Sequence, residues 1–263
     1  MSAPTTEARL PHPGSEQETG WFVYGVTRPS VSVPPDLTGV DDQPVLLLPH
    51  GEVAAIVSAA LLDRPPGRRA ELLSYTRVLD CLALRGPVAP VSFGSILADT
   101  DDVVASLLEP SGAELDALLD DLTGRLQLRL QAAYRDDVAL AEVVAHDPEV
   151  ARLRELTRDA PEGAFYGERI QLGRLVADAL EAVRAEDAET IVDAVRPRCV
   201  AVVAQPGNGL SRIVEAQLLV DDEERPELEE MLEALAEELH ERIALRLIGP
   251  LAPYDFVGGT PWA

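Results

Sequence analysis

The sequence contains no lysine, so arginine supplies all 22 basic residues, against 46 acidic ones and a formal net charge of -24. Nucleic-acid backbones bind positively charged surface, and no basic stripe occurs in this chain. The composition therefore argues against a nucleic-acid partner. A phosphate-binding loop of the Walker type requires a lysine, so that class of nucleotide site is excluded as well.

Cysteine and histidine are also scarce. Cys81 and Cys199 lie far apart within apolar sequence, which predicts reduced thiols in a core rather than a disulfide framework or a metal knuckle. The histidines are too widely spaced for a zinc site and are expected to be structural: His12, His50, His146 and His240.

Reactive motifs are missing too. The stretch around Ser92 and Ser95 lacks the Gly-x-Ser-x-Gly frame of a nucleophile elbow. Pairs of acids stand beside expected helix ends, where capping is the simpler role. We therefore predict that the chain is not an enzyme and needs no cofactor and no metal. Acid-base chemistry by Glu and His is the less favoured alternative.

Long hydrophobic runs are absent, because none approaches the roughly 18 residues that a membrane helix needs. The first residues are rich in Pro, Ser, Thr and Glu and lack the apolar core of a signal peptide. These features predict a cytoplasmic protein without a membrane span, preceded by a disordered arm at 1–19.

What is present is a succession of strand and helix patterns. Alternating or β-branched runs predict strands, and leucine at helical spacing predicts helices. The expected strands are 21–26, 45–48, 53–58, an edge strand at 88–93, 125–131, 199–204, 213–220 and 242–247. The expected helices are 68–84, one from 99 that breaks near Pro110 and resumes at 115–122, then 137–158, 168–195 and a last one opened by Pro226.

This order lacks the regular βαβα rhythm of a parallel sheet and favours an α+β fold. We expect two domains, each a mostly antiparallel sheet with helices packed on one face. The N-terminal domain is placed at 20–135, the C-terminal domain with long helices at 136–257, and a tail at 258–263.

Three stretches carry a family resemblance: Gly249 to Phe256, Trp21 to Val26 and Pro90 to Gly94. With them the chain, from about residue 20 to 257, resembles the gas vesicle protein F and L family. Ser92 stands where arginine is expected in many relatives, so a charge-based role of that position is not carried over.

The resemblance implies a non-enzymatic, gas-vesicle-associated protein with a modified ferredoxin-like fold, acting in nucleation or assembly of the vesicle wall. The implied partners are the small, very hydrophobic main wall protein and other accessory proteins. An acidic protein could hold such a subunit by strand addition or groove packing, its charge keeping the complex dispersed. A small-molecule-binding regulatory module remains the alternative.

Two aromatic residues, Tyr254 and Phe256, follow the last strand in a chain of only 4% aromatics. Nearby prolines limit the backbone, so both rings could be presented to a partner at low entropic cost. We take Phe93, Pro250, Tyr254 and Phe256 as the candidate partner contact. The other possibility is that the two rings fold back onto the chain's own core.

Overall fold

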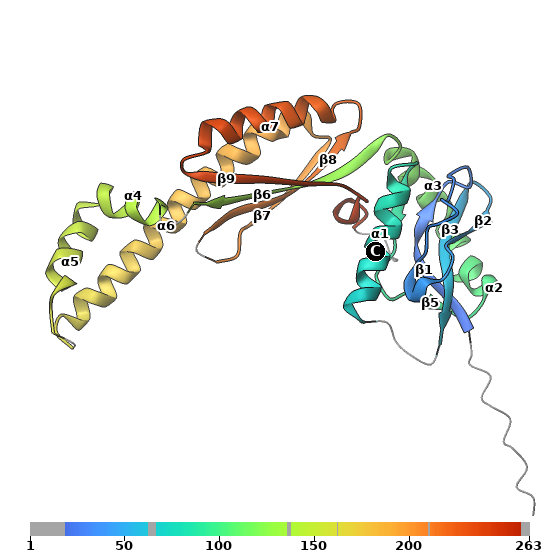
Figure 1. Ribbon diagram of the computed structural model, residues 1–263, viewed down its shortest axis with the longest axis horizontal. Helices are drawn as coiled ribbons and strands as arrows, with labels where there is room; N and C mark the ends of the chain where they lie inside the picture. Colours follow the sequence, from blue (N-terminus) through green and yellow to red (C-terminus); the bar gives the residue numbers. More distant parts are fainter. Residues whose placement is uncertain (1–18, 63–66, 136–137, 162, 210, 259–263) are drawn as a thin grey trace, which may run out of the picture.

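The molecule has three parts in a row (Figure 1): an N-terminal unit, a second sheet and a projecting helical arm. The computed structural model describes residues 19–62, 67–135, 138–161, 163–209 and 211–258. The predicted disordered arm and C-terminal tail lie almost entirely outside the described residues.

The N-terminal unit is built on a five-stranded antiparallel sheet in the order β2-β3-β1-β4, with β5 also paired to β1. The predicted strand around Pro90 lies at a sheet edge, as expected of a strand with a proline. The strands of this sheet are β1 (Thr19–Thr27), β2 (Leu46–His50), β3 (Val53–Leu61), β4 (Val88–Pro90) and β5 (Ile96–Leu97).

Helices pack against both faces of this sheet. Phe22 and Tyr24 share a core with α1, while Val23, between them, packs with α3. The expectation of helices on one face was wrong here, because β1 is buried on both sides and neither side can be left in water. The helices are α1 (Arg69–Ala83), α2 (Thr100–Val103) continued by a π-helical turn (Val104–Leu108), and α3 (Gly112–Asp121).

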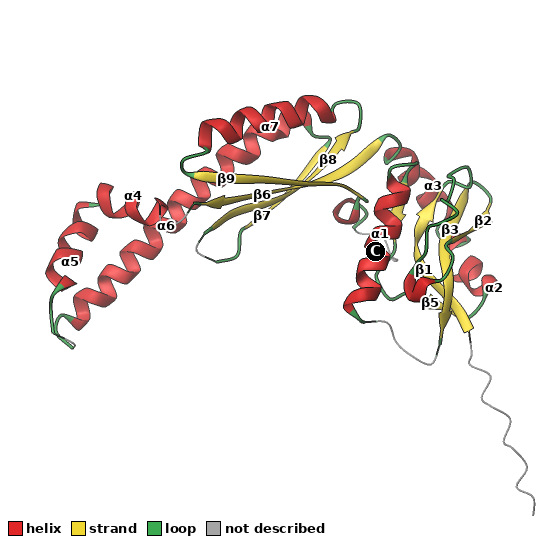
Figure 2. Ribbon diagram, in the orientation of Figure 1, coloured by secondary structure: helices red, strands yellow, loops and turns green. Residues whose placement is uncertain are grey.

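The second sheet is antiparallel, in the order β7-β8-β6-β9. Helices α6 and α7 cover one of its faces (Figure 2). Its elements are β6 (Arg125–Tyr134), β7 (Ala201–Pro206), β8 (Arg212–Asp221), β9 (Ile243–Leu251), α6 (Tyr166–Val195) and α7 (Arg225–Leu239). The α+β class and the predicted 199–220 hairpin are confirmed.

Strand β6 corrects the expected division of the chain. It pairs along its length with β8 and β9, so it belongs to the second sheet. The boundary expected at 135/136 falls on the wrong side of it, and the hydrogen bonding divides the chain near Gly124. Alternation predicted the strand and its buried face, but a strand pattern does not name its partner.

The arm consists of α4 (Val138–His146), α5 (Pro148–Arg158) and the first part of α6. The single helix expected at 137–158 breaks at Asp147, whose carboxylate caps α5 by accepting hydrogen bonds from the N–H groups of Glu149 and Val150. Pro148 then takes the first helical position, where its missing N–H costs nothing.

We expect Leu130→Ala in β6 to lower the free energy of unfolding by about 2–5 kcal/mol, because Leu130 is fully buried among α6, α7 and the sheet. The matched control is Leu73→Ala on α1, where 57% of the side chain is exposed, and it should change the value by less than about 0.5 kcal/mol. Urea unfolding measures both. Equal losses would contradict this assignment of the core.

Candidate functional site

The chain end returns to the N-terminal unit. After β9, the C-terminal segment (252–257) lies beside α1 (Figure 1). The backbone N–H of Ala252 donates to Oδ1 of Asp80 at 2.8 Å, and the Tyr254 hydroxyl donates to the same oxygen at 3.1 Å. One half-buried carboxylate on α1 therefore holds the end of the second sheet's last strand.

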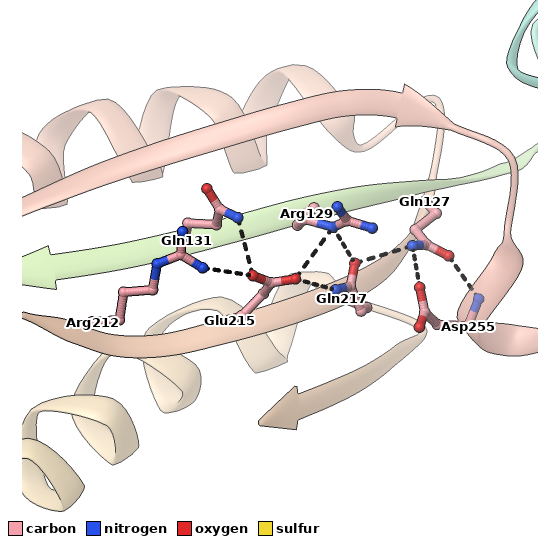
Figure 3. A network of polar contacts seen from close by, with 7 residues as sticks. All are labelled: Gln127, Arg129, Gln131, Arg212, Glu215, Gln217 and Asp255. Atoms are coloured by element: carbon pink, nitrogen blue, oxygen red, sulfur yellow. Dashed lines mark hydrogen bonds and ion pairs between the residues drawn. The ribbon is translucent and has the colours of Figure 1, made fainter. Parts of the chain in front are cut away.

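The same segment is also held by the second sheet (Figure 3). The Gln127 side chain donates to Oδ2 of Asp255 at 2.6 Å and accepts from the Asp255 backbone N–H at 3.1 Å. Gln127 is fully buried, so these bonds satisfy an amide that would otherwise be costly to bury. The C-terminal segment thus connects both units through paired polar groups.

This contact is one end of a polar row on the sheet face away from α6 and α7 (Figure 3). The row crosses between β6 and β8: Gln127 donates to Gln217 at 3.1 Å, Arg129 to Gln217 at 3.2 Å, and Gln131 to Glu215 at 3.0 Å. Cross-strand pairs of this kind stabilise the sheet. Each side chain of the row therefore has a hydrogen-bond partner within it.

The bend of β9 into this segment depends on one glycine. Gly249 has φ +145, and a Cβ there would lie 2.7 Å from Cδ2 of Leu128. The β6–β9 register shifts at this point, between Gln127 and Arg129. Only glycine allows the two backbones to approach so closely.

The candidate contact residues are brought together in part. The centroid of the Tyr75 ring lies 5.4 Å from that of Phe93 and 6.3 Å from that of Tyr254, so these three rings form one aromatic group. Phe256 packs on the core beneath α3, while Pro250 is a half-buried residue of β9. These contacts fit the fold-back alternative for Tyr254 and Phe256, and the partner role of all four remains a prediction.

Burial governs the electrostatics of this group. Burial raises the pKa of the Asp80 carboxyl, opposed by the hydrogen bonds from Ala252 and Tyr254. It also raises the pKa of Tyr254, helped by the neighbouring Asp80 charge, and raises that of Tyr75 to about 12. Both phenols therefore stay protonated near neutral pH, as donors.

The arm is fixed to the second sheet by a cluster of charges. Arg242, just before β9, donates to Glu142 of α4 at 2.8 Å and to Asp187 of α6 at 2.6 Å. Its guanidinium also lies 5.4 Å from the centroid of the Tyr134 ring. Arg242 therefore connects α4 and α6 to the second sheet at the base of the arm through charge-assisted hydrogen bonds.

Much of the arm's apolar surface is uncovered. Within the described part of α6, the buried residues are confined to its last turns: Ile191, Val192 and Val195. Nearer its start, Tyr166 is 72% exposed and Ile170 48%. A groove of about 580 Å³ runs between α4, α5 and α6, lined mainly by apolar residues: Leu140, Ala141, Val144, Ala145, Val150, Arg154, Leu172 and Val176.

Reactive constellations are not found in the described ranges. No group of three or more His, Cys, Asp and Glu there could hold a metal ion, and none of the helices described is long and apolar enough to cross a membrane. His146 and His240 lie at helix ends and contact backbone carbonyls. Burial raises the pKa of the free thiol of Cys199 to about 11, which makes it a poor nucleophile.

The architecture is that of known gas vesicle proteins. The structure matches the crystal structure of the gas vesicle protein GvpF from Anabaena sp. PCC7120 with a TM-score of 0.79 and 22% identity, covering 92% of this chain and 99% of that one. GvpF from Microcystis aeruginosa matches with a TM-score of 0.74 and 21% identity, over 90% and 98% of the two chains.

The sequence gives the family itself. The profile of the gas vesicle synthesis protein GvpL/GvpF family matches residues 20–258. Gas vesicle protein F of Streptomyces sp. (strain CB03234) is 33% identical, over 90% of this chain and 98% of its own length. The chain belongs to the GvpL/GvpF family and is a gas-vesicle-associated protein, which confirms the resemblance carried by the three sequence stretches.

Sequence reasoning missed the groove on the arm. Helical spacing predicted the helix at 168–195 but not that its Leu172 and Val176 line an open groove. In the structure, the sheet ends before this part of the helix begins. The length of the helix could have indicated this groove. A helix of 30 residues is about 45 Å long, which is longer than a four-stranded sheet can cover, so part of α6 must extend beyond the sheet.

We expect Asp80→Ala to lower the free energy of unfolding by about 1–3 kcal/mol, since the Ala252 N–H and the Tyr254 hydroxyl lose their acceptor. Asp80→Asn keeps an acceptor oxygen and should stay within about 1 kcal/mol of the parent at pH 7. Because burial raises the Asp80 pKa, the proton-linked part of the free energy of unfolding is complete below about pH 4 and declines as pH rises through the raised value, while the two hydrogen bonds remain. Asn should remove this decline in urea unfolding measured from pH 4 to 7. An Ala variant as stable as the parent would refute the contact.

We expect the double substitution Tyr254→Ala and Phe256→Ala to lower the melting temperature by several degrees, because each ring packs on the chain's own cores. Thermal unfolding measures this, and co-purification of the wall protein is followed in parallel. Unchanged melting with lost co-purification would instead assign both rings to the partner.

Proposed function

We propose that this protein acts in assembly of the gas vesicle wall by binding the small hydrophobic wall protein, and that it does so through surface contacts without catalysis. The observation that carries the proposal is the uncovered apolar surface of the arm. Five of its residues are large, apolar and more than a third exposed: Leu140, Leu156, Phe165, Tyr166 and Ile170. A groove lined mainly by apolar residues lies on the same arm, and exposed apolar patches mark interaction sites.

The shape of the arm supports a protein partner. Its groove lies open between three helices rather than enclosed, and a helix or strand with apolar side chains fits such a surface. Val143 on α4 and Leu153 on α5 are buried, whereas the residues of the open face are partly exposed to solvent.

The charge of the chain supports the same role. A net charge of -24 keeps a complex with an aggregation-prone subunit dispersed through repulsion between copies. Apolar contact would then supply affinity, while the acidic surface limits further association.

We expect the double substitution Leu140→Ser and Val176→Ser in the groove to reduce co-purification of co-expressed wall protein about tenfold or more, because apolar contact area is lost. Leu140 is 39% exposed and Val176 is half-buried, so the melting temperature should fall by no more than a few degrees. Both are measured on the same preparations.

The matched control changes two leucines elsewhere. Leu72 and Leu73 lie on α1 and are 44% and 57% exposed. The double substitution Leu72→Ser and Leu73→Ser should therefore leave co-purification unchanged. Equal losses in both variants would show a nonspecific hydrophobic effect and would remove the arm from the proposal.

A further inference from the structure

Strand β7 leaves one side of its backbone open. It is an outermost strand of the second sheet. Gly207, directly after β7, donates its N–H to Ile213 of β8 at 3.1 Å, and Gln205 lies opposite Glu215 in the same register. Inter-strand bonds in an antiparallel pair use every second residue. Val202 and Ala204 therefore direct their N–H and C=O groups away from β8, toward the free edge.

Little protects this edge. Residues Ala201–Pro206 include no charged side chain, although 26% of the chain is charged, and Val203 is 39% exposed. Sheet edges are usually blocked by charge, proline or a covering element. At β7 only Pro206, at the end of the strand, supplies such a block. The opposite edge strand, β9, carries both Arg246 and Pro250.

A groove of about 390 Å³ runs between α6 and this edge of the sheet. Small residues line it on both sides, with Ala185 and Ala188 on α6 and Ala204 on β7, and three acidic residues of α6 line it as well: Glu181, Glu189 and Asp193. Arg184 also lines it, and its Nε–H is buried and has no hydrogen-bond acceptor within the described part of the chain. A buried donor without an acceptor is costly, so an occupant with an oxygen acceptor would relieve that cost once the Arg184 side chain turns toward the groove.

We propose that the free edge of β7 binds an extended, apolar segment of the wall subunit by strand addition. The segment would pair its backbone with Val202 and Ala204. It would place one set of alternate side chains in the groove against α6 and present a carbonyl oxygen to Arg184. This inference rests on the proposed function, because it assumes that the wall subunit is the partner.

The geometry favours an extended segment over other occupants. A helix satisfies its backbone groups internally and has none to offer the edge. A second copy of this chain would bring a further net charge of -24 to the contact. An added strand satisfies both the edge and the neighbouring groove, which is the usual arrangement of strand addition.

The substitution Ala204→Pro tests the proposal. It removes an outward N–H while keeping the inward bonds to β8, as proline allows on an edge strand. We expect it to reduce co-purification of co-expressed wall protein about tenfold or more, with a melting temperature near that of the parent. The control Ala204→Ser keeps the N–H at a small, exposed residue and should retain binding.

Arg184→Lys provides a second variant that does not depend on proline. It keeps the positive charge but lacks the Nε–H, so co-purification should fall by about threefold or more. In the unaltered chain, hydrogen exchange at the amides of Val202 and Ala204 should slow when wall protein is bound. This readout reports pairing at the edge directly.

The outcomes separate the two proposals. If the unaltered chain captures no wall protein, the proposed function fails and the strand addition fails with it. If capture persists undiminished in Ala204→Pro and exchange at the edge is unchanged, only the strand addition is overturned. Dimers of the unaltered chain that disappear in Ala204→Pro, measured by light scattering, would assign the edge to a second copy and also overturn it.

Discussion

The hydrogen bonds of the C-terminal segment are the constraint on which the arrangement of the molecule depends. Asp80 on α1 and Gln127 on β6 both form hydrogen bonds with the C-terminal segment (252–257). Both groups are buried or half-buried, so each partner satisfies a polar atom that would be costly to leave unpaired. The two sheets are thereby connected by directional bonds as well as by apolar packing.

The arm projects from the other end of the second sheet (Figure 1). The charge cluster around Arg242 fixes α4 and α6 to the second sheet, and α6 extends beyond the sheet it helps to cover (Figure 1). One helix therefore contributes to the core at its C-terminal end and to open surface along the rest of its length. Residues of α6 line both the groove on the arm and the groove beside β7.

The polar row on the second sheet shows why satisfied groups make poor candidates for function. Its amides and charges have partners on adjacent strands. Arg184 differs, because its Nε–H is buried without one among the residues described. Open backbone at β7 and open apolar surface on the arm are the features that a partner could use, and both belong to a protein whose family membership associates it with gas vesicles.

The sequence by itself determined the α+β class, most strand and helix positions and the family, because these depend on local periodicity and on short motifs such as Gly249 to Phe256. It did not determine whether Tyr254 and Phe256 pack on the chain's own core or contact a partner. It also placed β6 in the N-terminal domain, whereas β6 belongs to the second sheet. The tertiary structure decided which strands pair and that β1 is covered on both faces. It also decided that α6 extends beyond the end of the sheet against which it packs. These outcomes depend on contacts between residues far apart in the chain, and a local pattern records that a face is apolar but not what will cover it.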